Sequence, residues 1–516
     1  MLSRYLRPLQ ASRTIYTPSK LLLSSMDRSH FTTKDIIHDL WSNLSLPASA
    51  LSDETLEIDG PEHTLPSSYR LSLIPPAAIA TSSLAASLVF SHRVPSLTNT
   101  IKKNIPKVTI NTLHATTEYK SESHIQILGS PSSELWGPVS GSHETSDNGI
   151  IGIHANFPNH AEAALKILGL PKDCTEKSII AEAVRRYKAI ELETLAHENK
   201  AVIYALRSPL EWSMTEQSHH LPTFPIILRK IGEAPAGLPP NLKNTNNIPK
   251  SCLSGLRVAE ISRVLAGPIC GRTLAAHGAD VLWIHGPHLP SLPGLDVDTS
   301  RGKRSTFLDL RDEEGRDKLE QLLSTADVFI QSFRPGALAT KGFSPQKVAS
   351  MNPNGIIYAS LNAFGESGPW KDRRGFDSMV QLCSGVNVSE AEYFGKKGER
   401  FKKWPCQVLD HTAGYFLAIG ILAALNRRIL EGGSWEVHVS LAGVMEYITS
   451  LGRIEGTEGF DTPAVSKQDL GEFMETKEGK LGSLKGVKHA GRVDGVEVGY
   501  RYMPTELGYY EATWEG

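Results

Sequence analysis

Apolar and polar segments alternate regularly along the chain from about residue 255 onward. Short apolar runs at 258–261, 281–284, 328–330 and 356–360 are typical of buried strands. Helical patterns fill the intervals between these runs, at 268–277, 313–325 and 344–351. Because strands that alternate with helices form βαβ units, the pattern predicts an α/β fold with an open parallel sheet.

The first of these units has an informative turn between its strand and its helix. The strand ends at a turn that carries Ala266, Gly267 and Pro268, and proline suits the first helical turn, where its missing N–H costs nothing. The free N–H groups of the helix start then face the usual ligand position beyond the carboxyl end of the strand. Gly267 and Gly271 do not form the G-x-G-x-x-G fingerprint, so we predict a nucleotide-type site without the dinucleotide motif.

The N-terminal half has a different order of elements. A small-residue helix is predicted at 77–93 and a short strand at 108–113. Further on, the pattern predicts strands near 150–157 and 201–206, with helices between them at 159–168, 175–189 and 191–198. A stretch rich in Gly, Pro and Asn follows, and we place a linker at 241–254. We expect the polar, glycine-rich tail at 456–516 to wrap a surface.

The helical segment at 77–93 resembles in its size pattern a second segment at 412–428. Each is followed, after a loop, by a short strand, at 108–110 and at 437–439. Small-residue helices look alike by chance, so this repeat is weak by itself. If it is real, position 75 in the first copy matches position 410 in the second.

Composition and charge narrow the class of protein. The 516 residues are 40% hydrophobic and 21% charged, which is ordinary for a soluble globular chain of two or three domains. The formal net charge of −2, with no basic stripe interleaved with aromatics, argues against a nucleic-acid partner. No apolar run approaches the length of about 20 residues that a membrane helix needs, and we therefore expect no membrane partner.

The cysteines and the first residues suggest a compartment. The five cysteines are scattered without a C-x-x-C pair, which favours reduced thiols over a disulfide or metal framework. Residues 1–26 are rich in Arg and Ser and contain no acid, as in a mitochondrial transit peptide. We therefore expect a mitochondrial location. The alternative is an irregular start, with translation from Met26 and a cytoplasmic protein.

Asp410 is the candidate for chemistry, because it lies directly before the long helical segment. Asp in this position is a favoured N-cap, worth about 1 kcal/mol. A carboxylate near a helix start is also a candidate nucleophile for acyl transfer through a covalent intermediate. The pattern alone does not choose between a cap and a catalytic group.

Seven sequence blocks occur in an order that resembles family III CoA-transferases, also called the CaiB/BaiF family. They are SRVLAGP (262–268), GRTLAAHGADV (271–281), RGKRSTFLDLR (301–311), ADVFIQSFRPGALATKGF (326–343), NPNGIIYASLNAFGESGP (352–369), GFDSMVQLCSG (375–385) and LDHTAGYFLAIGILAAL (409–425). The resemblance implies an open parallel-sheet, Rossmann-like nucleotide domain with a smaller α+β domain. It implies a CoA thioester as substrate, with no permanently bound cofactor.

Residues 148–206 resemble the small domain of this family, which normally follows the catalytic aspartate's helix and strand. Here the small domain comes first, so the chain is arranged like a degenerate second half fused ahead of a first half. We therefore expect a degenerate helix–strand copy at 30–130, a small α+β domain at 131–240 and a CoA-binding catalytic domain at 255–455. Pro75 gives the first copy no nucleophile.

The resemblance makes Asp410 the catalytic nucleophile of a CoA-transferase. In the family this aspartate attacks an acyl-CoA thioester to give a mixed anhydride, which CoA converts to an aspartyl-CoA thioester before an acceptor acid completes the exchange. The implied partners are an acyl-CoA donor and a carboxylic acid acceptor, with a homodimer possible because family enzymes are interlinked rings. Two alternatives stay open: a non-catalytic acyl-CoA binding or scaffold protein, and a 2-methylacyl-CoA racemase. Racemases of the family place a proton-transferring His before the aspartate at Asp377, where this chain has Phe376.

Contacts to CoA carry over from the resemblance only where the letters agree. The matching positions are Val264, Leu265 and Ala266 at the thioester end, Leu308 and Arg311 at the adenine and ribose, Phe333 and Ala337 on the nucleotide, and Arg374 near the phosphates. The two arginines could equally be solvated surface charges. His285 and Gly286 replace a common Glu–Arg step, and Thr340 replaces a basic residue, so the phosphates are expected to be held differently.

Overall fold

The computed structural model describes residues 27–94, 105–131, 136–243, 248–462 and 464–515, so the transit peptide predicted at 1–26 lies outside the described residues. Its central element is a seven-stranded sheet with the strand order β10-β9-β8-β11-β12-β13-β7. Six strands are parallel: β8 (Arg257–Ile261), β9 (Asp280–His285), β10 (Arg304–Phe307), β11 (Val328–Gln331), β12 (Ile357–Asn362) and β13 (Ser434–Ser440). The predicted open parallel sheet is confirmed. Its strand order has the form 3-2-1-4-5-6 of a doubly wound nucleotide-binding fold.

Two strands of this sheet were missed by the sequence pattern. β10 lacks an apolar run, because its Arg304 is buried through pairing with Asp280 on β9. β7 (Ile226–Gly232) precedes the six parallel strands in the chain and pairs antiparallel with β13 at the sheet edge. Its partner lies two hundred residues further along the chain, and local periodicity carries no information on such pairing.

Alternate strand residues face two separate cores. On one face, Val258, Val328 and Val437 pack with the helices α9 (Ala266–Ala276) and α15 (Val408–Glu431). On the other face, Ala259 and Phe329 belong to the core beneath α11 (Glu313–Leu323) and α12 (Pro345–Met351). The remaining helices of this region are α10 (Pro293–Thr299), α13 (Asp377–Cys383), α14 (Val386–Phe394) and α16 (Leu441–Ser450).

The helix α15 lies inside the molecule between the sheet and a further helix, α2 (Ile74–Arg93). Both are long and apolar enough by length and composition to cross a membrane, and both are almost entirely buried in the protein. The expectation that no apolar segment approaches membrane-spanning length was therefore wrong. Scattered polar residues such as Asp410 and Asn426 interrupt the apolar run in the sequence, while the helix continues through them.

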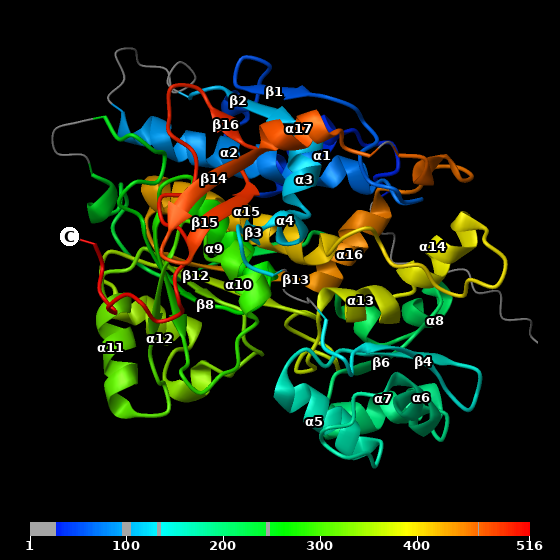
Figure 1. Cartoon of the computed structure of the whole chain (residues 1–516). Coiled ribbons are helices and arrows are strands. Elements are labelled where there is room, and N and C mark those ends of the chain that lie inside the picture. The colour runs from blue at the N-terminus through cyan, green and yellow to red at the C-terminus, as the bar shows by residue number, and fades with distance from the viewer. Residues whose placement is uncertain (1–26, 95–104, 132–135, 244–247, 463, 516) are drawn as a thin grey trace, which may run out of the picture.

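The two ends of the chain fold together over α2 (Figure 1). The N-terminal segment holds α1 (Thr33–Asn43), β1 (Leu56–Asp59), α2, β2 (Val108–Asn111), α3 (Thr112–Glu118), α4 (Ser121–His124) and β3 (Gln126–Ile127). The C-terminal tail holds α17 (Lys467–Phe473), β14 (Met474–Gly479), β15 (Gly482–Val487) and β16 (Arg492–Val493). β16 pairs with β2 and β15 pairs with β3, so each end completes a sheet of the other.

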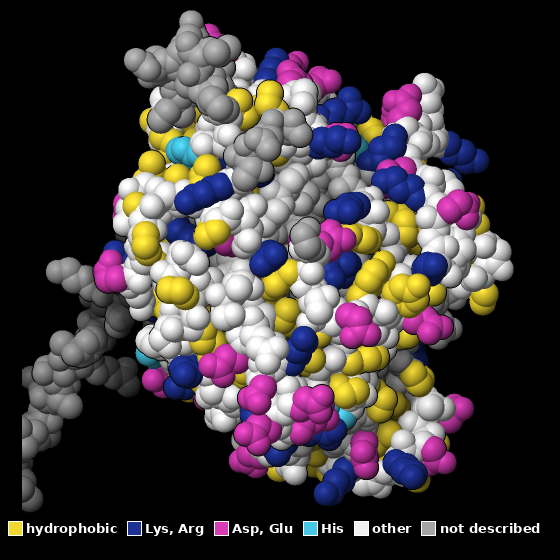
Figure 2. Space-filling view, turned by 90° about the vertical axis from the view of Figure 1, so that its left-hand side faces the viewer, with side chains coloured by type: hydrophobic (Ala, Val, Ile, Leu, Met, Phe, Trp, Pro, Cys, Tyr) yellow, Lys and Arg dark blue, Asp and Glu magenta, His cyan; other side chains and the backbone are white. Residues whose placement is uncertain are grey.

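The end of the tail continues along β10 and α11 of the region that holds the parallel strands. The backbone N–H of Tyr510 donates to the carbonyl of Ser305 on β10, and the Trp514 indole donates to the carbonyl of Leu322 at the end of α11. On the face shown in Figure 2, cationic and acidic side chains are interspersed, which agrees with the net charge near zero.

The small domain is an antiparallel sheet covered by helices on one side. Its strands β4 (Gly141–Glu144), β5 (Ile150–Ile153) and β6 (Ile203–Ala205) lie in chain order. Helices α5 (Pro158–Ile167), α6 (Lys177–Val184) and α7 (Ala189–Glu198) cover them around a separate apolar core, with α8 (Pro209–Ser213) beyond. The predicted strands and helices at 150–206 are present, with the helix expected at 175–189 ending earlier.

The same order of elements occurs in the two segments that the sequence pattern related. Helix α2 leads to strand β2 and then directly to α3, as α15 leads to β13 and then directly to α16. Each short helix is capped at its start by a side chain that accepts an N–H from three residues on, Asn111 in one segment and Ser440 in the other. Pro75 is buried near the start of α2.

Candidate active site

The carboxyl ends of β8 and β11 diverge where the strand order of the sheet reverses. In doubly wound sheets ligands bind at this switch point. The turn after β8 runs through Arg263 and Val264 into α9, and the turn after β11 begins at Ser332. The two turns contact each other directly, because the Ser332 hydroxyl accepts the backbone N–H of Arg263 at 3.3 Å. A side chain at Gly267 would collide with Ser332, so glycine allows this close approach.

Val264 has an unusual backbone conformation at this turn. Its φ of 72° lies in the left-handed region, which costs a β-branched residue about 1–3 kcal/mol and is concentrated at functional sites. The bend begins α9 and turns Val264 and Leu265 toward Asp410, since all three line the same cavities. The strain identifies this turn as part of the site.

Asp410 lies in the first turn of α15 and is 7% exposed. It is not the N-cap, so the capping role considered from the sequence was wrong. Helix α15 begins earlier, at Val408, and its first N–H groups are capped from another element. The Asp377 carboxylate on α13 accepts the N–H of Leu409 at 2.7 Å and that of Asp410 at 3.0 Å. Gln381 donates its side-chain N–H to the second oxygen of Asp377 at 2.5 Å.

Acidic neighbours surround the Asp410 carboxyl. Burial raises the pKa of Asp410 well above its usual range, and the nearby carboxylates of Asp377 and Glu122 raise it further. Burial also raises the pKa of Asp377, in spite of the N–H groups that it accepts. Two carboxyls this close resist simultaneous ionisation. The ionised form of Asp410 is therefore a carboxylate of raised basicity in a site that is largely closed to water.

The next residue on α15, His411, is fully buried and is held from the N-terminal segment. Its Nε2 lies 2.9 Å from a carboxylate oxygen of Glu122 on α4. The ring of Tyr119 stacks on that of His411 at 5.1 Å between centroids. The start of α15 is thus fixed by α13 on one side and by the N-terminal segment on the other.

Two cavities meet at Asp410. The first, which we call the arginine chamber, has an empty volume of about 1030 Å³ and opens at the switch point of the sheet. The residues that line it include Arg263, Val264, Leu265, Ala266, Phe333, Arg334, Ala337, Arg373, Arg374, Phe376 and Asp410. The second, which we call the aromatic chamber because Trp136, His154, Phe376 and Trp404 line it, has an empty volume of about 1070 Å³. The two chambers share Val264, Leu265, Phe376 and Asp410.

The arginines of the arginine chamber differ in whether they have an ion-pair partner. Arg373 lies 3.7 Å from the Glu193 carboxylate and stacks on Trp370. For Arg334 and Arg374, the described part of the chain offers no ion-pair partner to either guanidinium. Burial lowers the pKa of Arg374 and the positive charge of Arg334 lowers it further, so the two cations face a common space. Such an arrangement favours a bound anion.

Most of the residues predicted to contact CoA come together here. Val264, Leu265, Ala266, Phe333, Ala337 and Arg374 all line the arginine chamber beside Asp410. Leu308 and Arg311 are outside the residues that line it. Leu308 packs against the core under α11, and Arg311 is 60% exposed and paired with Asp309.

Sequence reasoning missed Arg263 and Arg334, although both stand in turns at the carboxyl ends of strands. Their position directly after the carboxyl end of a strand was the signal that could have identified them as site residues. It also missed the walls contributed by other segments, such as His160 of α5, since no local pattern indicates which distant helix covers a site. Burial lowers the pKa of His160 to about 4, and the positive charges of the nearby arginines lower it too, so the ring is neutral.

Residues 253–471 match the model of the family described as CoA-transferase family III. The chain is 30% identical over 318 residues to an acyl-CoA transferase of Gibberella moniliformis, covering 58% of this chain and 54% of that protein. It is 33% identical over 217 residues to a succinate–glutarate CoA-transferase of Agrobacterium fabrum, covering 39% and 53%. The solved structure of Rv3272 from M. tuberculosis matches 39% of this chain and 58% of that chain, at 31% identity and a TM-score of 0.36. The chain thus spans about half the length of the curated relatives that it matches.

Proposed function

We propose that this chain, which belongs to CoA-transferase family III through its residues 253–471, moves CoA from an acyl-CoA thioester to a carboxylic acid through a covalent intermediate on Asp410. The observation that carries the proposal is the position of Asp410 at the junction of two chambers. One chamber presents uncompensated arginines at a nucleotide-binding switch point, as the diphosphate of CoA requires. The other gives a second reactant access to the same carboxylate.

The first half of the reaction forms an anhydride and then a thioester on the protein. An oxygen of the Asp410 carboxylate attacks the thioester carbonyl, the C–S bond breaks, and CoA leaves as its thiolate. The thiolate then attacks the Asp410 carbonyl carbon of the anhydride. This releases the donor acid, which takes with it the bridging oxygen from Asp410, and leaves an aspartyl-CoA thioester.

The second half repeats these steps with the acceptor acid. Its carboxylate attacks the aspartyl-CoA thioester and expels the CoA thiolate, giving a new anhydride. The thiolate attacks the acceptor's acyl carbon, which yields the new acyl-CoA and returns Asp410 as a carboxylate. No proton, oxidant or further reactant is consumed over the cycle.

The surrounding residues suit this chemistry. Arg334 and Arg374 supply charge for an anionic part of CoA, and the start of α15 places positive N–H dipoles near the carboxylate. Burial of Asp410 excludes the water that would hydrolyse an anhydride or a thioester. The raised basicity of Asp410 makes its ionised form a better nucleophile.

A racemase is the second candidate, and one contact favours it. The His154 ring stacks on Phe376 at 3.7 Å between centroids and lines the aromatic chamber with Asp377 and Asp410. An imidazole is therefore present although Phe376 itself transfers no proton. Burial lowers the pKa of His154 to about 3, however, which makes it a weak base. Transferase activity predicts no α-proton exchange of a 2-methylacyl-CoA in heavy water, whereas rapid exchange that depends on His154 would establish the racemase.

Trapping with hydroxylamine tests the transferase. Incubation with an acyl-CoA and hydroxylamine is expected to convert Asp410 to its hydroxamate, which mass spectrometry of the peptide detects. Asp410→Ala is expected to lose both trapping and transfer while keeping its fold, because the substitution removes a desolvated carboxyl. The exposed Asp173→Ala serves as the matched control. Transfer by Asp410→Ala at the rate of the control would reject Asp410 as the covalent nucleophile. If the wild-type chain showed neither trapping nor transfer, a binding or scaffold role would remain.

A further inference from the structure

We propose that the aromatic chamber is the acid site of the transferase and that Lys120 and Lys403 in it select a dicarboxylic acid by binding its far carboxylate. This inference rests on the proposed function and specifies the class of its acid substrates. The chamber is built from three separate parts of the chain. Lys120 and Glu122 come from the N-terminal segment, Trp136 and His154 from the small domain, and Lys403 from the loop before α15.

The lysines of the chamber are not paired with its acids. Of the three acids that line it, Glu122 is engaged by His411, Asp377 is engaged by the N–H groups at the start of α15, and Asp410 is the proposed reacting group. Among the residues that the structure describes, the amines of Lys120 and Lys403 have no hydrogen-bond or ion-pair partner. The two uncommitted cations therefore face a cavity in which no described side chain neutralises them.

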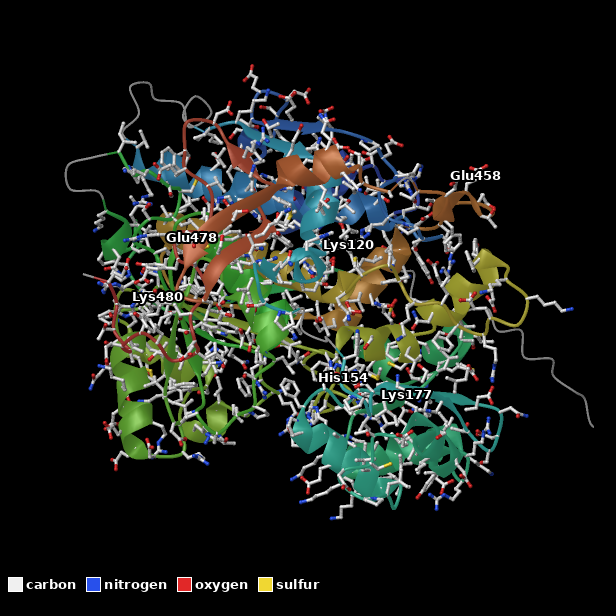
Figure 3. All side chains as sticks on the ribbon, viewed as in Figure 1. Lys120, His154, Lys177, Glu458, Glu478 and Lys480 are labelled. Atoms are coloured by element: carbon white, nitrogen blue, oxygen red, sulfur yellow. The ribbon has the colours of Figure 1, made fainter. Side chains whose placement is uncertain are left out.

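Each lysine is aimed at the chamber by its surroundings. The Lys403 amine lies over the Trp136 ring, 5.6 Å from its centroid, and burial lowers the Lys403 pKa. Lys120 lies near the Cys406 thiol, whose burial-raised pKa it partly lowers. Figure 3 shows Lys120 on the α4 side and His154 on the small-domain side of this region.

The chemistry of the site favours a flexible diacid over a simple fatty acid. The reacting carboxylate must meet Asp410, which lies on the wall shared with the arginine chamber. The rest of the molecule then extends between Phe376, His154, Trp404 and Trp136, which suits a methylene chain. A second carboxylate at its far end meets the lysines and gains charge-assisted hydrogen bonds. A monocarboxylic acid places a methyl group at this end instead, which leaves the amines of both lysines unpaired.

Matched acid pairs test the selection: succinate against butyrate, and glutarate against valerate, with one acyl-CoA donor. The wild-type chain is expected to use each diacid with a kcat/KM at least about tenfold above its partner, since a hydrogen bond to a charged group contributes about 1.5–3 kcal/mol. Lys120→Met and Lys403→Met should each reduce this ratio, and the double variant should bring it near unity. Lys177→Met, on the exposed start of α6 (Figure 3), is the matched control and should keep the wild-type ratio.

Calorimetric titration of the full chain with glutarate and with valerate separates this inference from the proposed function. Preferential glutarate binding that disappears in the double lysine variant supports the acid site, even if hydroxylamine traps nothing at Asp410 and the transferase is rejected. If Asp410 is trapped but the chain uses the diacid and the monoacid equally well, the acid-site inference is overturned while the proposed function stands. A diacid preference that survives in the double variant also overturns it. Thermal unfolding of the variants confirms that the fold is retained.

Discussion

At the scale of single residues, the site is organised by the contact between Asp377 and the start of α15. The carboxylate of Asp377 supplies the cap that the helix lacks in its own sequence, since Gln407 makes no side-chain capping bond. The same carboxylate stands close enough to Asp410 to raise its pKa. Asp377 thus positions the start of α15 and has an electrostatic effect on Asp410, the proposed nucleophile.

The substitution Asp377→Asn separates these two effects. The asparagine oxygen still accepts an N–H of α15, while the negative charge beside Asp410 is removed. In the proposed reaction Asp410 attacks only when ionised, and its folded-state pKa is raised, so transfer should be lost as pH falls through that pKa. Removing the Asp377 charge lowers the Asp410 pKa and should move the acidic limb of the kcat/KM profile to lower pH. The control Asp309→Asn, outside both chambers, should leave the acidic limb of the kcat/KM profile in place. An unmoved acidic limb in Asp377→Asn would contradict the effect of the Asp377 charge on the Asp410 pKa.

Residues carried by contiguous motifs were predictable from sequence, whereas residues brought by separate segments were not. Val264, Leu265 and Arg374 stand in blocks that resemble the family, and they line the arginine chamber as expected. Lys120 and His154 reach the site only through the packing of the N-terminal segment and the small domain. No spacing in the sequence relates them to Asp410.

At the scale of elements, the close packing of α15 on α9 determines the shape of the site. A Cβ at Gly414 would lie 2.6 Å from the carbonyl oxygen of Ala266 and 2.8 Å from the Ile269 Cβ. Glycine therefore lets α15 approach the first turn of α9, where the strained Val264 and its neighbours form the chamber wall. The helix tolerates the glycine because α15 is held on all sides by the core.

Gly414→Ala should consequently weaken both stability and binding. Alanine gains up to about 1 kcal/mol of helix propensity over glycine, but overpacking costs about 1–3 kcal/mol. We expect a net loss in the free energy of unfolding and a higher KM for the acyl-CoA, measured by denaturation and steady-state kinetics. In Gly471→Ala, on α17, the new Cβ meets no atom within 4 Å, so this control should be neutral or more stable. A Gly414→Ala protein as stable and active as the control would refute the packing argument.

The strands and helices with strong periodicity were predicted within a few residues, as with the runs that became β8, β9, β11 and β12. The exceptions share a physical cause. β7, β15 and β16 are defined by partners far away in the chain, and β15 and β16 are also short, polar or glycine-rich. Pairing of this kind is decided by tertiary packing rather than by local propensity.

At the scale of the whole molecule, the N-terminal segment covers surface that the catalytic region cannot leave exposed. Helix α2 packs along α15, β2 pairs with β16 of the tail, and Glu122 holds His411 next to Asp410. We propose that this segment is a degenerate copy that takes the place of a partner subunit. Because Pro75 occupies the position that matches Asp410, each chain should contain one active site.

A fragment of residues 255–516 should therefore be insoluble or inactive. Its loss of α2 uncovers the apolar side of α15, and its loss of β7 exposes the edge of β13. A fragment that begins at Asp27 keeps every described element and is the matched control for solubility and transfer. Titration with trapped acyl groups should count one site per chain in that control. A soluble and fully active 255–516 fragment would reject the covering role.

The transfer of oxygen from the acceptor acid to Asp410 is the direct test of covalent catalysis by this carboxylate. The proposed cycle transfers one oxygen from the acceptor acid to the aspartate carboxyl in each turnover, because the bridging oxygen of the second anhydride stays on Asp410. The wild-type chain is incubated with an acyl-CoA and an acceptor acid labelled with oxygen-18 in its carboxylate, and the peptide containing Asp410 is then weighed and fragmented by mass spectrometry. Heavy oxygen is expected at Asp410 and at no other carboxyl, with Asp377 unlabelled. Complete transfer with no heavy oxygen at Asp410 would contradict it.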